Sequence, residues 1–166
     1  MTETARLPEV EVSLTVNGER VTRRIEPRMT LVDFLRLELE LTGSHVGCEH
    51  GVCGACTVRV DDEIVRGCLM FAVQADGTNV VTIEGLADGG SEDDLLEAFR
   101  ERNAVQCGFC TPGMVMTASD LLARYPSASR DEIREFLSGN YCRCTGYQAI
   151  VDAIEKVSQS RAGGGR

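Results

Sequence analysis

Cysteine is the residue type whose number and spacing say most about the chemistry of this sequence. Its 166 residues contain eight cysteines, and these fall into two groups of four. The first group is Cys48, Cys53, Cys56 and Cys68, and the second is Cys107, Cys110, Cys142 and Cys144. Four thiolates are the usual ligand set of a [2Fe-2S] cluster. The two groups therefore predict two redox clusters, one in each group.

The spacing within the first group favours this interpretation. Its cysteines follow the pattern C-x4-C-x2-C, and the fourth comes after eleven further residues. The first three match the spacing of plant-type ferredoxins. Glycines at 47, 51 and 54 let the backbone of this loop approach a cluster without a Cβ clash. His45 and His50 are interpreted as loop residues, because both groups already hold four cysteines.

Three other uses of the cysteines have to be weighed. Disulfides need an oxidising compartment, and residues 1–12 contain no apolar run of the length that a signal peptide needs. Zinc is a stronger alternative for the second group, since Cys107-x2-Cys110 and Cys142-x-Cys144 could close a tetrahedral site. Buried, unreactive cysteines are a third alternative. The two tight groups in glycine-rich loops argue against buried, unreactive cysteines.

Composition limits the possible partners. The sequence has 17 basic and 26 acidic residues, a formal net charge of −9. Nucleic-acid binding needs a basic face, so that role is not expected. No segment approaches the roughly 20 apolar residues of a membrane span. The missing signal sequence favours a cytoplasmic location.

The N-terminal half is expected to be mixed strand and helix. Apolar residues alternate over 10–16, and Asn17-Gly18 predicts a tight turn into a second strand over 19–25. Thr30 is expected to cap a helix that ends before Gly43. After the cysteine loop, we expect a second hairpin over 57–60 and 63–66, and a last strand that includes Val80, Val81 and Ile83. This order predicts a β-grasp, ferredoxin-like domain over residues 9–86.

The C-terminal half is expected to be helical. Two capping boxes, Ser91-x-x-Asp94 and Ser129-x-x-Glu132, and the pair Thr111-Pro112 indicate helix starts. The four expected helices cover 93–102, 113–124, 131–138 and 147–157. They predict an all-α, four-helix domain over residues 91–158, in which two helix N-termini can face one anionic cluster. Residues 159–166 are expected to be a disordered tail. The predicted fold class is therefore α+β, with two metal-binding domains.

Three strings make a family resemblance visible. They are GCEHGVCGAC over 47–56, QCGFCTPG over 106–113 and GNYCRCTGY over 139–147. Together they resemble the iron-sulfur subunit of the molybdenum hydroxylases, the family of xanthine dehydrogenase, aldehyde oxidoreductase and carbon monoxide dehydrogenase. The resemblance extends over about residues 9–158. It implies an electron-transfer subunit that relays single electrons from a molybdopterin centre through two [2Fe-2S] clusters toward FAD or another acceptor.

The resemblance also implies roles for particular residues and partners. All eight cysteines correspond to cluster ligands, Gln106 to a glutamine that contacts the pterin, and Cys144 to a ligand beside the pterin amino group. Molybdopterin is expected on a large partner subunit and FAD on a medium one, in a hetero-oligomer that is often a dimer of heterotrimers. No substrate-converting site is visible in the chain itself. A free-standing ferredoxin-like carrier and a zinc or thiol-sensing module are the alternative functions.

Overall fold

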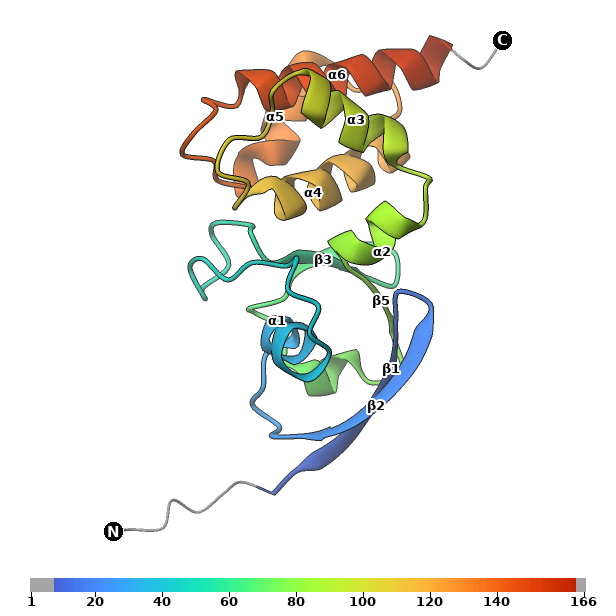
Figure 1. Ribbon diagram of the computed structural model, residues 1–166, viewed down its shortest axis with the longest axis vertical. Helices are drawn as coiled ribbons and strands as arrows, with labels where there is room; N and C mark the ends of the chain where they lie inside the picture. The colour runs from blue at the N-terminus through green and yellow to red at the C-terminus, as the bar shows by residue number, and fades with distance from the viewer. Residues whose placement is uncertain (1–7, 164–166) are drawn as a thin grey trace.

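The computed structural model describes residues 8–163. A sheet and a helical half lie at opposite ends of the long axis, and α2 (Ile83–Asp88) lies between them (Figure 1). The two halves have separate hydrophobic cores. Val12, Leu14 and Phe34 belong to the core beneath the sheet, whereas Met114 and Ile154 belong to the helical core. This arrangement confirms the predicted α+β class and the order of its two parts.

The sheet has five strands in the order β2-β1-β5-β3-β4. Both predicted hairpins are confirmed: β1 (Val10–Val16) pairs antiparallel with β2 (Glu19–Ile25), and β3 (Thr57–Val60) with β4 (Glu63–Arg66). The central strand β5 (Asn79–Val81) joins the hairpins, since it runs parallel to β1 and antiparallel to β3. Long-range pairing of the last strand therefore joins the two hairpins into one sheet.

The last strand is shorter than expected. Thr82 ends it because its backbone N–H donates to Asn17 Oδ1 at 2.9 Å, and its hydroxyl accepts from Asn17 Nδ2 at 3.0 Å. Ile83 therefore begins α2, and its assignment to a strand was wrong. Leu86 of α2 packs with the helical core. The division of the chain between residues 86 and 91 stays a prediction.

The helix next to the sheet is short. Thr30 caps α1 (Leu31–Asp33) as predicted, since its side chain accepts from the Asp33 N–H, and the chain continues as a π-helical turn, η1 (Phe34–Glu38). The helical segment therefore ends before Gly43, as predicted, with Glu38 as its last residue. Glu40 has a φ of +58°, and the N–H of Leu41 donates to Leu35 O at 2.9 Å, which closes the helix. A short 3₁₀ helix, η2 (Ala72–Ala75), precedes β5.

The helical half contains α3 (Asp93–Glu101), α4 (Thr111–Arg124), α5 (Arg130–Phe136) with the 3₁₀ turn η3 (Leu137–Gly139), and α6 (Gln148–Gly163). The Ser129–Glu132 capping box is confirmed. Three details were wrong. Ser91 does not cap α3, whose N-cap is Glu92, and α4 begins at Thr111 with Cys110 as N-cap. Residues 159–163 are helical, not a disordered tail, and 164–166 lie outside the described residues.

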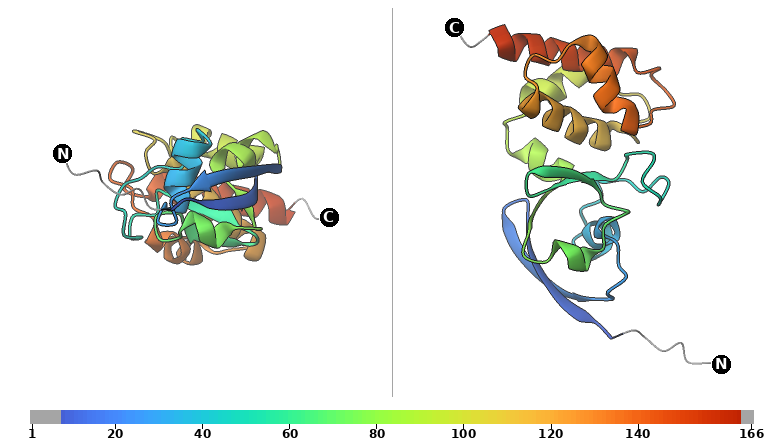
Figure 2. Two further views of the ribbon diagram at one scale, coloured as in Figure 1. Left: turned by 90° about the horizontal axis from the view of Figure 1, so that it is seen from below. Right: turned by 180° about the vertical axis from the view of Figure 1, so that it is seen from behind.

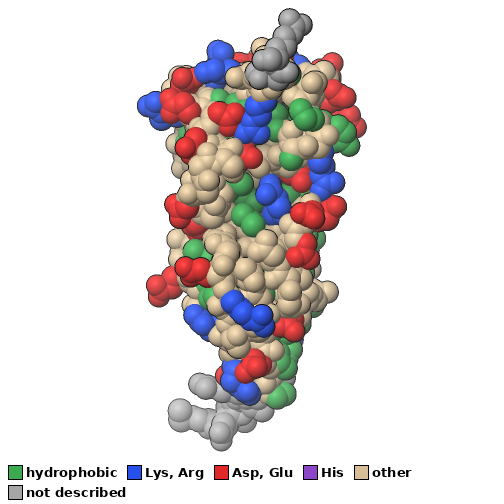
Figure 3. Space-filling model, turned by 90° about the vertical axis from the view of Figure 1, so that its right-hand side faces the viewer, with side chains coloured by type: hydrophobic (Ala, Val, Ile, Leu, Met, Phe, Trp, Pro, Cys, Tyr) green, Lys and Arg blue, Asp and Glu red, His purple; other side chains and the backbone are tan. Residues whose placement is uncertain are grey.

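The loops that carry the two cysteine groups emerge on the same side of the molecule, at the junction of its two halves (Figures 1 and 2). Figure 3 shows the opposite side, where acidic and basic side chains are interspersed over both halves. None of the helices described in residues 8–163 has the length and apolar character needed to cross a membrane.

Candidate metal centres

The first cysteine group lies in the loop between η1 and β3, and its fourth member, Cys68, follows β4. Cys56 is buried and the other three are half-buried. The Cys53 thiol affects the pKa of Cys48, and the Cys56 and Cys48 thiols affect the pKa of Cys68, so the thiols lie close together, with Cys48 beside Cys53 and Cys56 beside Cys68. All eight cysteines of the chain are free thiols. The β3–β4 hairpin thus closes the group by bringing Cys68 back to Cys56.

Local backbone groups favour the thiolate at Cys48. The backbone N–H of His50 makes the largest contribution to a pKa of about 6, below the ordinary 9.0, and the N–H groups of Cys53 and Val52 act in the same direction. Burial, reinforced by the Cys56 thiol, raises the pKa of Cys68 to about 11. The loop therefore provides N–H donors for negative charge on sulfur at one end and a drier environment at the other.

The second cysteine group is held by two helix N-termini. Cys107 and Cys110 precede α4, with Cys110 as its N-cap, and Cys142 and Cys144 lie in the loop before α6. The sulfurs again pair, Cys110 with Cys142 and Cys107 with Cys144. Burial raises the pKa of Cys110 to about 12, whereas Cys107 and Cys144 are exposed. The pairs thus differ in depth, one inside the domain and one at its surface.

Cys142 has neighbours that stabilise its thiolate. Burial alone would raise its pKa, but hydrogen bonds from the hydroxyl and backbone N–H of Thr145 lower it. The Thr145 hydroxyl lies 3.1 Å from Cys142 Sγ, and it accepts from the Tyr147 N–H at 3.1 Å. The Tyr147 hydroxyl accepts from the Cys142 N–H at 3.0 Å. These bonds fold residues 142–147 into a closed loop around the sulfur.

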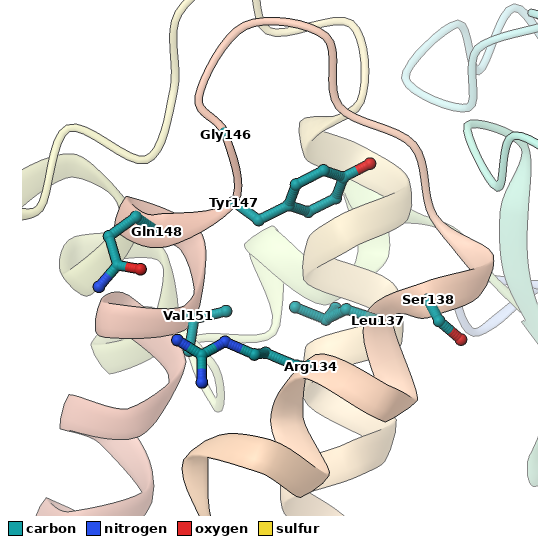
Figure 4. Close-up of a pocket in the computed structure, with 7 residues that line it drawn as sticks. All are labelled: Arg134, Leu137, Ser138, Gly146, Tyr147, Gln148 and Val151. Carbon is teal, nitrogen blue, oxygen red and sulfur yellow. The ribbon is translucent and has the colours of Figure 1, made fainter.

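A pocket of about 290 Å³ lies behind this loop (Figure 4). Tyr147 forms one wall, and its φ of +66° turns the ring toward Leu137 and Val151 while the hydroxyl points to the loop. The pocket therefore abuts the second cysteine group but takes no cysteine into its lining.

The two cysteine groups are in contact with each other. The ring of Phe109, between Cys107 and Cys110, stacks on His45 with centroids 4.8 Å apart, and its carbonyl lies 2.8 Å from His45 Nδ1. The N–H of Tyr141 donates to the carbonyl of Cys53 at 2.8 Å. His50 bonds the Cys48 carbonyl. Both histidines thus occupy the loops as expected, although the role of His45 between the groups had no signal in the sequence.

The donor set fits iron-sulfur clusters better than single ions. Among residues 8–163, no three His, Cys, Asp or Glu side chains converge as they would around one metal ion. Each group instead presents two pairs of thiols. A [2Fe-2S] cluster takes four thiolates, two for each iron.

Gln106 and several apolar side chains lie exposed around the two groups. Val105, Phe109 and Tyr141 surround the second group, with 43%, 48% and 57% of their surface exposed. Near the first group, Val52, Leu69 and Phe71 are exposed in the same way. Large apolar side chains gathered around functional loops are typical of surfaces that bind other proteins.

Two protein families match the chain in succession. The 2Fe-2S iron-sulfur cluster binding domain matches residues 14–82, and the [2Fe-2S] binding domain matches residues 82–155. Together these matches span both cysteine groups, and they show that the chain has two [2Fe-2S]-binding domains.

Whole-length relatives agree with the family matches. The chain is 55% identical over 150 residues to the caffeine dehydrogenase subunit gamma of Pseudomonas sp. (strain CBB1), covering 89% of this chain and 90% of the relative. It is 50% identical over 154 residues to the nicotine 6-hydroxylase small subunit of Paenarthrobacter nicotinovorans, covering 93% of both chains. In a crystal structure of quinoline 2-oxidoreductase from Pseudomonas putida 86, a chain 48% identical superposes with a TM-score of 0.88, covering 94% of this chain and 98% of that one. The chain therefore belongs to the iron-sulfur subunits of the molybdenum hydroxylase family.

Proposed function

We propose that Cys48, Cys53, Cys56 and Cys68 hold one [2Fe-2S] cluster of this electron-transfer subunit, and that Cys107, Cys110, Cys142 and Cys144 hold the other. The observation that carries the proposal is the pairing of thiols, two pairs in each group. When bound, a [2Fe-2S] cluster supplies one-electron storage, which divides the two electrons released by substrate oxidation into single transfers.

The chain's own groups stabilise negative charge at both centres. At the first, the N–H of His50 and its neighbours point at the Cys48 sulfur. At the second, α4 begins directly after Cys110, so its N-terminal dipole favours an anionic centre. Because reduction adds negative charge, these donors favour the reduced form and raise the reduction potential of each site.

The second group is the side proposed to meet the molybdopterin-binding large subunit. Gln106, Cys107 and Cys144 are all exposed there, and the apolar side chains of Val105 and Tyr141 lie beside them. The family roles of Gln106 and Cys144, contact with the pterin and a place beside its amino group, both require this exposure. The exposed Val52, Leu69 and Phe71 near the first group are proposed to contact an FAD-binding subunit.

The substrate class is proposed from the relatives. Caffeine, nicotine and quinoline, named for the three similar proteins, all contain a nitrogen heterocycle. A complex that includes this chain is proposed to oxidise a nitrogen heterocycle at its large subunit, with no substrate bound by this chain.

Metal analysis of the chain, purified from its own host with the proteins that accompany it, tests the function. We expect four irons per chain together with molybdenum, since each of the two domains binds a [2Fe-2S] cluster. Four irons without molybdenum or a partner would favour a free-standing carrier. Zinc in place of iron would overturn the cluster assignment.

Replacing Gln106 by alanine tests the proposed partner face. We expect both clusters to remain, because Gln106 is exposed and is not one of the eight cysteines proposed as ligands. Electron transfer from the molybdenum centre should slow by roughly tenfold, the effect of one lost hydrogen bond of about 1.4 kcal/mol. Rapid-freeze measurement of cluster reduction by substrate gives the rate. Gln159→Ala, an exposed glutamine on α6, is the control, and unchanged reduction in Gln106→Ala would contradict the assignment.

Replacing Thr145 by valine tests its effect on the second centre. The Thr145 hydroxyl accepts from Tyr147 N–H, so its own proton is available to the Cys142 sulfur 3.1 Å away. Loss of this bond should lower the reduction potential by roughly 20–60 mV, from a hydrogen bond of about 0.5–1.5 kcal/mol. Redox titration followed by EPR measures the shift. Thr145→Ser keeps the hydroxyl and should stay near the wild-type potential, whereas an equal shift in both variants would assign the effect to packing.

A further inference from the structure

Asn140 occupies a buried position between the two cysteine groups. It is 2% exposed and comes two residues before Cys142. Its Nδ2 donates to the carbonyl of Gly54 at 3.2 Å, and Gly54 lies between Cys53 and Cys56. One side chain in the helical domain thus bonds to the backbone of the loop that carries the first group.

The acceptor end of the same amide is also occupied. Asn140 Oδ1 accepts from the Thr117 hydroxyl of α4 at 3.1 Å and from Arg66 Nη2 of β4 at 3.3 Å. A buried amide that is satisfied at both ends has one orientation of low energy, since any rotation leaves a donor or acceptor unpaired. The position of Asn140 is therefore fixed by both domains together.

Arg66 adds a second connection from the sheet. Its Nη2 donates to the carbonyl of Gly139 at 2.7 Å, and its Nη1 donates to the hydroxyl of Thr57, whose hydroxyl in turn donates to Gly54 O at 2.6 Å. Arg66 thus holds the segment that leads to Cys142 and, through Thr57, the segment between Cys53 and Cys56.

The backbone completes the connection. The Tyr141 N–H donates to Cys53 O at 2.8 Å, so the residue before Cys142 is bonded directly to a cysteine of the first group. A side chain at position 54 would prevent this approach, because a Cβ on Gly54 would lie 2.6 Å from Asn140 Nδ2 and 2.7 Å from Gly139 O. Side-chain and backbone bonds therefore set a single spacing between the two loops.

We infer that Asn140 is a positioning residue that fixes the two cysteine loops relative to each other, and hence the separation and orientation of the two redox centres. An apolar residue could fill the same space, but packing alone would not specify which backbone groups meet. This inference rests on the ligand sets proposed above.

The test compares Asn140→Ala with Ser119→Ala in the chain loaded with iron. Ser119 of α4 is the matched control. Like Asn140 it is buried, and its hydroxyl accepts from Arg59 across the interface at 3.0 Å, away from both cysteine groups. Two readouts apply: the magnetic interaction between the two reduced centres, measured by pulsed EPR in frozen solution, and hydrogen exchange of the Tyr141 amide.

We expect Asn140→Ala to keep four irons, to show a weakened or broadened magnetic interaction, and to exchange the Tyr141 amide roughly tenfold faster. Ser119→Ala should match the wild type in both. The inference would be overturned if Asn140→Ala kept the wild-type magnetic interaction and the wild-type exchange rate of the Tyr141 amide. It would also be overturned if Ser119→Ala showed the same changes as Asn140→Ala, because the effect would then belong to the interface as a whole.

A second variant covers the case in which Asn140→Ala does not fold. Asn140→Asp keeps the shape of the side chain and an acceptor for Thr117 and Arg66, but it replaces the donor to Gly54 O by a carboxylate oxygen, which repels that carbonyl. It should show the same two changes, and wild-type behaviour would overturn the inference. Iron content separates this result from a failure of the ligand assignment: fewer than four irons in the wild type would contradict the ligand sets, whereas Tyr141 exchange still reports on the position of the loops.

Discussion

Replacement of Cys142 by alanine is expected to lower the iron content of the chain from four atoms to two. Cys142 is paired with the more deeply buried Cys110, so its loss removes the inner half of the second site. The Cys48 group keeps all its thiols and should still load. Because binding of a structural metal group contributes folding free energy, the helical half should also lose stability more than the sheet half.

Iron and labile sulfide per chain, with melting followed by a signal from each half, measure this result. Cys53→Ala is the reciprocal variant. It should remove the cluster of the first cysteine group, in the ferredoxin-like half, while the second cluster remains. Four irons in Cys142→Ala, or an unaltered melt of the helical half, would contradict the prediction. Loss of both centres in either variant would show that the halves fold as one unit, for which the Tyr141–Cys53 backbone bond supplies a physical connection.

Local patterns predicted the elements that depend on nearby residues. Alternation and the Asn17-Gly18 turn located the first hairpin, and its register is the one that a two-residue turn dictates, with Val16 opposite Glu19. The Ser129–Glu132 capping box located α5. The cysteine spacing predicted two groups, and the structure brings the members of each together as pairs up to 37 residues apart in the sequence, Cys107 with Cys144.

The features that the sequence did not reveal depend on contacts between distant residues. Ile83 has the side chain of a strand residue, but the bonds of Asn17 to Thr82 end the strand before it. The helix after Thr30 ends before Gly43 as expected, but its end at Glu38, followed by the bond of the Leu41 N–H to Leu35 O, had no signal in the sequence. Helix α3 has Glu92, not Ser91, as its N-cap, and the Glu92 carboxylate accepts a hydrogen bond from Arg161 near the opposite end of the domain. Propensity carries no information on such partners.

A close approach of the two halves at Gly113 was also invisible in the sequence, and it gives the second large prediction. Gly113 lies in the first turn of α4, where alanine would ordinarily stabilise a helix by about 1 kcal/mol. Here a Cβ would lie 2.1 Å from the carbonyl oxygen of Gly54 and 3.2 Å from Ala55 Cα. Both contacts are with backbone, which cannot rotate away as a side chain can. The glycine is thus required by the contact between α4 and the first cysteine loop.

Gly113→Ala is therefore expected to destabilise the chain by about 1–3 kcal/mol, the usual cost of overpacking, and to lower Tm by roughly 2–12 °C. Since Gly54 and Ala55 lie between Cys53 and Cys56, the displaced loop should also load iron less completely. Gly163→Ala is the control, because a Cβ there meets no atom within 4 Å, and it should melt close to the wild type. Thermal unfolding and iron content decide the matter. A Gly113→Ala chain as stable as the wild type would mean that α4 can move from the loop at no cost, and that the two halves are not held at one distance by their backbones.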